Sequence, residues 1–77
     1  MQINVLAFGQ IAEAMNGESF TFSNINTTND LIDYLKQQYA SLKTLDYKIA
    51  VNKQIIHSNM PLNNHDTVAL LPPFSGG

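Results

Sequence analysis

Two glycines close the sequence, and their type and position suggest chemistry more clearly than any other residues do. Glycine loses more backbone entropy on ordering than any other residue and packs no side chain, so Gly76 and Gly77 add little stability. They suit a terminus that threads a narrow channel, where any Cβ would clash, and they leave the α-carboxylate unhindered. We therefore expect Gly77 to be the reacting residue, with Phe74, Ser75 and Gly76 as the segment that inserts into a partner.

The residues ahead of the glycines favour an extended tail. Pro72 and Pro73 cannot continue a sheet ladder, and they favour a course away from the body of the domain. The segment 72–77 spans at most about 20–22 Å when it is extended. Because that reach can present the terminus inside another protein, we expect a domain over residues 1–73 and a flexible Gly-Gly tail over 74–77.

Other residue types that do chemistry occur without the partners they need. His57 and His65 have no metal-ligand spacing with a carboxylate, so we expect no metal site. Asp30 and Asp33 share one helix face, which can serve acid–base work but is more typical of a solvated helix start. Ser75 has no neighbouring base, and the chain has no Cys and no glycine-rich phosphate loop. The sequence therefore predicts no catalytic group in the body of the chain and no bound cofactor.

Composition and charge exclude several classes of protein. The chain has 77 residues, which is one domain with a thin core. Its hydrophobic content of 44% is too high for a disordered chain. No apolar stretch approaches the roughly 18 residues of a membrane span, and the N-terminus lacks the basic stretch of a signal peptide. Because there is no Arg and the Lys residues are scattered, nucleic-acid binding is not expected, and a cytoplasmic setting fits best.

Five short segments predict strands. Side chains of different type alternate along residues 2–8, 19–22 and 47–51, residues 54–56 return as a short strand, and residues 67–71 are continuously apolar, as in a strand covered on both faces. Asn52-Lys53 is a plausible two-residue turn between the third and fourth of them, because Asn tolerates a positive φ.

Two helices are expected between these strands. Apolar residues recur at helical spacing over 11–15, and Asn16-Gly17 would end that short helix. A longer apolar stripe predicts the main helix over 28–41, with Thr27 or Thr28 as its cap. One main helix and four or five strands indicate an α+β roll, a mixed sheet folded over the helix. If the last strand runs parallel beside the first, this arrangement is the β-grasp, or ubiquitin-like, fold.

The alternation also predicts an apolar surface beside the tail. The residues expected to face the main helix are Ile3, Val5, Ala7, Val68 and Leu70. The residues between them then face the other way, and we expect them to form a partner interface. These are Leu6, Phe8, Ala69 and Leu71. The alternative is that the short helix over 10–16 covers part of this surface.

Several motifs together resemble a known family over essentially the whole chain. The opening strand ends in Leu-Ala-Phe-Gly-Gln (6–10), with Glu13 and Gly17 spaced after it. Ala-Val-Asn (50–52) and Pro61-Leu62 follow, with Asp-Thr-Val (66–68) after them. The most specific feature is the ending Pro-Pro-Phe-Ser-Gly-Gly. In these features the chain resembles the small subunits of molybdopterin synthase, also called molybdopterin converting factor subunit 1, which are ubiquitin-like sulfur carriers.

The resemblance implies a function for the terminus. A ubiquitin-activating-like adenylyltransferase would use ATP to adenylate the Gly77 carboxylate, and persulfide-derived sulfur would convert it to a thiocarboxylate. The small subunit would then dock on the molybdopterin synthase large subunit, as part of a heterotetramer, and insert its tail. Sulfur would pass to cyclic pyranopterin monophosphate during molybdenum cofactor biosynthesis. The resemblance thus implies a sulfur-donating subunit that is not an enzyme on its own.

Three other functions stay open at this point. The chain could be the sulfur carrier of thiamine synthesis, or a ubiquitin-like modifier that is conjugated through Gly77. It could also be a ubiquitin-like interaction domain whose tail has no chemistry. Because the activation chemistry is shared, sequence alone does not separate the carriers from the modifier.

Overall fold

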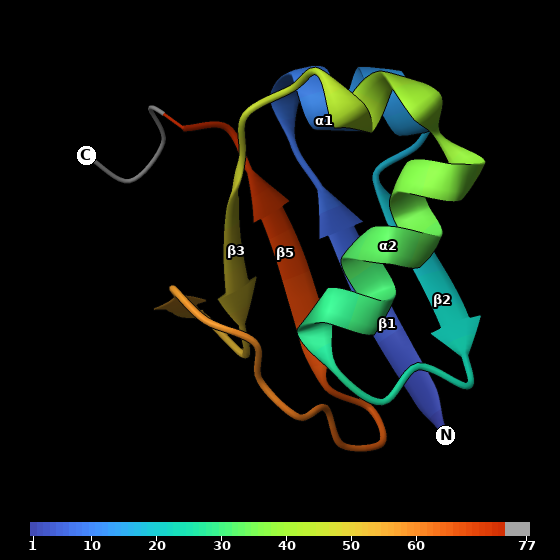
Figure 1. The fold of residues 1–77 in the computed structure, drawn as a ribbon, viewed down its shortest axis with the longest axis vertical. Helices are drawn as coiled ribbons and strands as arrows, with labels where there is room; N and C mark the ends of the chain where they lie inside the picture. The colour runs from blue at the N-terminus through green and yellow to red at the C-terminus, as the bar shows by residue number, and fades with distance from the viewer. Residues whose placement is uncertain (74–77) are drawn as a thin grey trace.

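The computed structural model describes residues 1–73, and this part of the chain forms a five-stranded sheet with α2 lying across one face (Figure 1). The elements are β1 (Gln2–Ala7), α1 (Gly9–Met15), β2 (Ser19–Ser23), α2 (Thr28–Gln38), the 3₁₀ helix η1 (Ala40–Lys43), β3 (Lys48–Val51), β4 (Gln54–Ile56) and β5 (Thr67–Leu71). The strand order is β2-β1-β5-β3-β4. The two central strands, β1 and β5, are parallel, and the other neighbours are antiparallel. This topology confirms the predicted β-grasp fold.

The core lies between the α2 face of the sheet and the helices. Val5 pairs with Val68 and Ala7 with Leu70, and all four side chains are buried. Leu31 and Leu35 of α2 pack against this layer and are fully buried. The alternation along β1 and β5 therefore directs one set of side chains into the core, as predicted, because successive residues of a strand point to opposite faces.

The main helix is shorter than the predicted range of 28–41. The side chain of Thr27 accepts a hydrogen bond from the Asp30 N–H at 3.2 Å, which caps α2 as expected. At the other end Tyr39 leaves the helical region, with φ −129° and ψ 87°. The chain then turns into η1, which buries Leu42 in the core. Because this turn redirects the chain, the single apolar stripe read from the sequence is divided between two helices.

The ends of the strands also differ from the prediction. β1 stops at Ala7, and Phe8 leads into α1 instead of continuing the strand. Gly9 begins α1 with a φ of +58°, a conformation that L side chains rarely adopt. β2 continues to Ser23, and Tyr47 lies outside β3.

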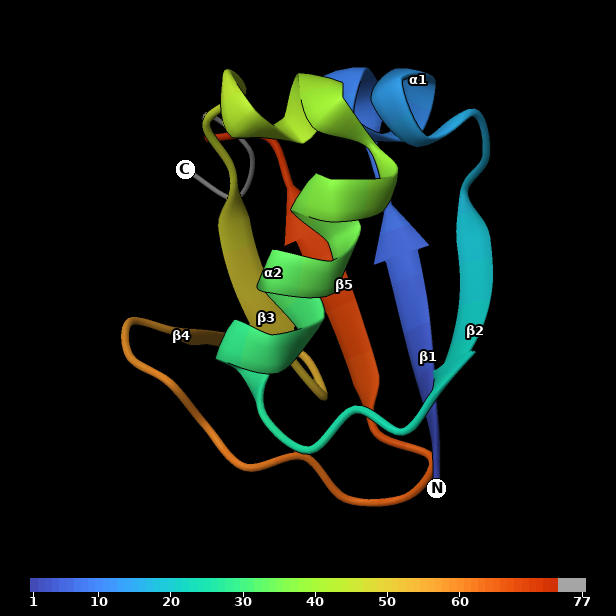
Figure 2. The same cartoon turned by 45° about the vertical axis from the view of Figure 1, so that its right-hand side comes forward.

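The connection from β4 to β5 is hydrogen-bonded to the start of α2 (Figure 2). The Thr28 N–H donates to the Met60 carbonyl oxygen at 2.9 Å, and the Met60 N–H donates to Thr28 Oγ1 at 2.9 Å. The Asn29 N–H donates to Asn59 Oδ1 at 2.8 Å. This segment therefore satisfies donors at the helix start that would otherwise lack partners. No helix within residues 1–73 is long and apolar enough to cross a membrane.

Candidate functional site

The sheet face opposite α2 carries an apolar surface at the end where β1 and β5 finish. Strand pairing places Leu6 beside Ala69, Ala69 beside Ala50, and Ala50 beside Ile55, which makes one row across four strands. Phe8 and Leu71 lie beyond this row, nearer the tail. We call Leu6, Phe8, Ile55, Ala69 and Leu71 the outer patch; they border a hollow of about 530 Å³. Phe8 and Ile55 are 44% and 43% exposed.

The structure thus brings together all four residues predicted for a partner interface and adds one that was missed. Ile55 stands out from a three-residue strand, and its place beside Ala50 follows from the turn that joins β3 to β4. The predicted turn at Asn52 and Lys53 could have revealed Ile55 from the sequence, because a two-residue turn fixes which residues of the two strands oppose each other.

α1 lies beyond the end of the sheet and does not cover the outer patch (Figure 1). Its buried side chains, Ile11 and Met15, join the core on the α2 side. The apolar side of α1 is thus used in the core, and Ala12 borders a hollow together with Leu6 and Phe8, so the helix flanks one edge of the outer patch.

The opposite end of the same sheet face is polar and holds a hydrogen-bonded connection between two of the sequence motifs. Asn52, in the β3–β4 turn, donates from Nδ2 to Asp66 Oδ1 at 2.9 Å and accepts the Thr67 N–H at 2.9 Å. The Asn63 N–H donates to Asp66 Oδ2 at 2.8 Å. The bond from Asn63, followed by that from Asn52, holds the pKa of Asp66 below its ordinary value. This connection fixes the start of β5, and β5 leads directly to the tail.

The base of the tail rests against the start of α1. A Cβ added to Gly9 would lie 2.9 Å from Pro72 Cγ, so the proline ring sits directly on the glycine backbone. The Phe8 N–H donates to the Leu70 carbonyl oxygen at 3.3 Å, which continues the parallel pairing to the last residues of β5. The predicted tail residues Phe74, Ser75, Gly76 and Gly77 lie outside the described residues, and their roles stay predictions. The last described residues, Pro72 and Pro73, directly follow Leu71 of the outer patch.

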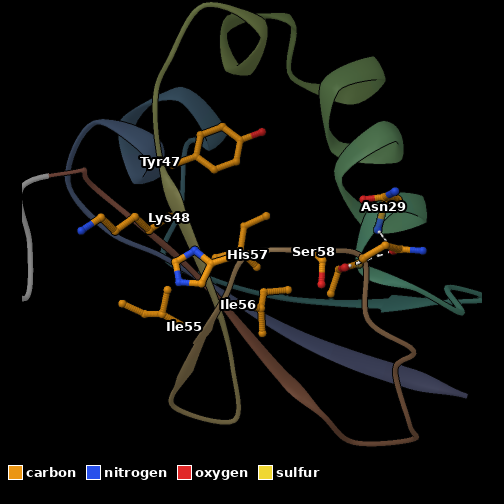
Figure 3. A pocket seen from close by; sticks show the side chains of 10 residues that line it. Asn29, Tyr47, Lys48, Ile55, Ile56, His57 and Ser58 are labelled. Atoms are coloured by element: carbon orange, nitrogen blue, oxygen red, sulfur yellow. Dashed lines mark hydrogen bonds between the residues drawn. The ribbon is translucent and has the colours of Figure 1, made fainter.

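The other candidates for chemistry are dispersed. Within residues 1–73 no group of three or more His, Asp or Glu side chains could hold a metal ion. His57 lies at a second hollow between β4 and the start of α2 (Figure 3). The His65 N–H donates to the Gln2 carbonyl oxygen at 2.7 Å. Asp30 lies in the first turn of α2, where the helix dipole stabilises a carboxylate. Burial raises the pKa of Tyr47, which borders the same hollow as His57.

Comparison with known proteins adds information that geometry does not contain. The family model described as ThiS family matches residues 5–77. A molybdopterin synthase sulfur carrier subunit from Dictyostelium discoideum is 30% identical over 83 residues, covering 99% of this chain and 96% of the relative.

Two solved structures resemble the chain along nearly its whole length. One is the protein–protein complex of subunits 1 and 2 of molybdopterin-converting factor from Helicobacter pylori 26695, with 32% identity, a TM-score of 0.76 and 100% coverage of both chains. The other is small archaeal modifier protein 1 from Methanosarcina acetivorans, with 22% identity, a TM-score of 0.83, and coverage of 99% of this chain and 96% of that one. At 22% identity, the likeness to the Methanosarcina acetivorans protein shows a shared fold alone.

Proposed function

The chain belongs to the ThiS family of ubiquitin-like sulfur carriers, and from this premise we propose that it is the sulfur carrier subunit of a molybdopterin synthase. The observation that carries the proposal is the position of the Gly-Gly terminus. It follows β5, a central strand, by only a few residues, and β5 contributes Ala69 and Leu71 to the outer patch. A partner that binds the patch is therefore placed to receive the tail. The sulfur carrier subunit from Dictyostelium discoideum supports this assignment.

The chemistry assigned to Gly77 begins with activation. A carboxylate is a poor electrophile, so an adenylyltransferase first transfers AMP from ATP to it and releases pyrophosphate. The terminal sulfur of a donor persulfide then attacks the acyl carbon and displaces AMP, which gives an acyl disulfide. A second thiol of the donor cleaves the S–S bond and is left as a disulfide, and this releases a thiocarboxylate whose sulfur is ionised at neutral pH and strongly nucleophilic. Such a group is easily oxidised, which suits a reducing compartment, and we place these steps in the cytoplasm.

Delivery takes place on a second partner. We propose that the outer patch docks on the molybdopterin synthase large subunit, and that Phe74, Ser75 and Gly76 carry the thiocarboxylate into its active site. The complex of subunits 1 and 2 from Helicobacter pylori supports a partner of this kind. Glycine at both final positions allows passage through a channel that is too narrow for a Cβ. The acceptor is cyclic pyranopterin monophosphate, and the large subunit supplies the acid and base groups for the transfer.

A single-turnover reaction tests the proposal. Thiocarboxylated protein mixed with a large subunit and cyclic pyranopterin monophosphate should give product in proportion to the carrier supplied, because each Gly77 holds one sulfur. The carboxylate form should bind the large subunit and give no product. A chain that ends at Gly76 should fold normally but accept no sulfur. Full activity of that shortened chain, or many products per carrier without reloading, would contradict a carrier role.

The mass of the protein isolated from its own cells separates this function from the alternatives. A carrier should be found partly as a thiocarboxylate, in which one oxygen is replaced by sulfur. A modifier should instead be found joined by an isopeptide bond from Gly77 to lysines of other proteins. If the thiocarboxylated protein supports thiazole formation for thiamine and not conversion of the pterin, the thiamine pathway is the correct one.

A further inference from the structure

The outer edge of β4 is open to a further strand. Within residues 1–73, β4 is the last strand in the sheet order and pairs with β3 alone. The turn at Asn52 and Lys53, with φ values of 49° and 73°, makes Val51 and Gln54 the closing pair of the hairpin. Hydrogen-bonded and non-bonded pairs alternate along an antiparallel ladder. The N–H and C=O groups of Ile55 therefore point away from β3, toward the open edge.

A hollow lies on each side of this edge. The inner one, of about 500 Å³, lies between β4 and the start of α2 and is bordered by Tyr47, Ile49 and Ile56 (Figure 3). The outer one is the hollow of the outer patch. Ile55 borders both hollows. Because successive side chains of a strand point to opposite faces, a strand paired with β4 would place them alternately in the two hollows.

The charges around β4 are of one sign. Lys48 borders the inner hollow and Lys53 borders the outer one, and neither hollow is bordered by Asp or Glu. The carboxylate of Asp66, behind the turn, is held by Asn52 and Asn63. The chain as a whole carries a net charge of −2, so this local excess of cations runs against the overall balance. Such a surface favours an acidic partner.

We propose that β4 accepts an extended segment of a partner protein as a sixth strand, and that this segment carries apolar side chains flanked by Asp or Glu. The backbone of Ile55 supplies the hydrogen bonds, the two hollows take the apolar side chains, and Lys48 and Lys53 meet the carboxylates. A second copy of the chain is a poorer occupant, since it would bring its own Lys48 and Lys53 to this edge and no Asp or Glu beside them. This inference concerns the strand edge and does not depend on sulfur chemistry.

A phage-displayed library of random twelve-residue peptides, selected on the full chain, tests the proposal. The decisive variant is Ile55→Pro, which removes the outward N–H but none of the bonds to β3; its matched control, Ile55→Val, keeps that N–H. We expect the selected peptides to combine apolar residues with Asp or Glu. Each should bind the parent and Ile55→Val alike, and Ile55→Pro at least tenfold more weakly.

Circular dichroism of Ile55→Pro establishes that the variant is folded, and amide exchange on the unmodified chain supplies an independent measurement. Exchange of the Ile55 N–H should slow when a selected peptide binds. Selection of no peptide, or of basic peptides, overturns the proposal. The proposal is also overturned if the selected peptides leave the exchange of the Ile55 N–H unchanged. A concentration-dependent dimer in sedimentation that Ile55→Pro abolishes would overturn it too, because the occupant of the edge would then be a second copy of the chain.

Discussion

Asn52 Nδ2 lies 2.9 Å from Asp66 Oδ1, and this hydrogen bond joins the β3–β4 turn to the residue that precedes β5. The two residues are 14 positions apart and belong to separate motifs of the sequence. Because Asn52 also accepts the Thr67 N–H, one side chain sets where β5 begins. The position of β5 in turn sets the position of Pro72, which directly follows it.

Acidification should destabilise the protein through Asp66. Hydrogen bonds from Asn63 and then Asn52 lower the pKa of Asp66 in the folded state, so the carboxylate stabilises the fold at pH values above its unfolded pKa of about 3.9. This contribution is lost as the pH falls through the folded pKa. Urea unfolding at several pH values should show a smaller loss of stability below pH 4 or so in Asp66→Asn than in the parent. Asp33→Asn, at an exposed position of α2, is the control and should keep the parent's pH dependence.

Removal of the Asn52 side chain should weaken the turn without straining it. Asn52→Gly tolerates the φ of +49° but loses the bonds to Asp66 and Thr67, at a cost of about 1–2 kcal/mol in the free energy of unfolding. Lys53→Gly is the matched control at the adjacent residue, whose φ is +73°. A side chain at a positive φ strains the backbone, and glycine relieves that strain. Lys53→Gly should therefore be neutral or slightly stabilising in urea unfolding. Equal destabilisation by the two changes would show that the bonds of Asn52 contribute nothing.

A charge in the outer patch should separate binding from folding. Phe8→Asp changes a side chain that is 44% exposed, so the melting temperature should change little. Binding to the large subunit, measured by calorimetry, should weaken at least tenfold, because the charge would be desolvated in an apolar interface. Leu71→Asp should weaken binding in the same way. The control is Val5→Asp, at a fully buried position of the same strand as Leu6, and it should unfold the domain. If Phe8→Asp is also unfolded, the assignment of Phe8 to the outer face of the sheet is wrong.

The contact between the β4–β5 connection and α2 should depend on one buried hydroxyl. Thr28 is 2% exposed, and its Oγ1 donates to Asn59 Oδ1 at 3.2 Å while it accepts the Met60 N–H. Thr28→Val keeps the shape of the side chain but leaves the Met60 N–H without this acceptor, which should cost about 1–3 kcal/mol in the free energy of unfolding. Thr28→Ser retains the hydroxyl and should be less destabilising. Equal losses in the two variants would assign the effect to packing.

Much of the fold follows from local patterns that the sequence determines by itself. Once β1 and β5 are assigned as strands, their period of two residues divides the side chains into two sets, one of which enters the core. The same alternation leaves Leu6, Ala69 and Leu71 for the opposite face. Thr27 marks the start of α2 through its own side chain. The expectation that Gly77 reacts likewise rests on residue type, since only glycine lacks a Cβ.

Only the tertiary structure decided how distant segments meet. Ile55 joins the outer patch because β3 lies between β5 and β4, which brings it into one row with Leu6 and Ala69. The end of α2 at Gln38 depends on a turn that buries Leu42, and Asn59 reaches the start of that helix from 30 positions away. Local periodicity records which way each side chain points along one element, whereas these contacts depend on the order of strands in the sheet. That order is set by the packing of the whole core, so no short stretch of the sequence contains it.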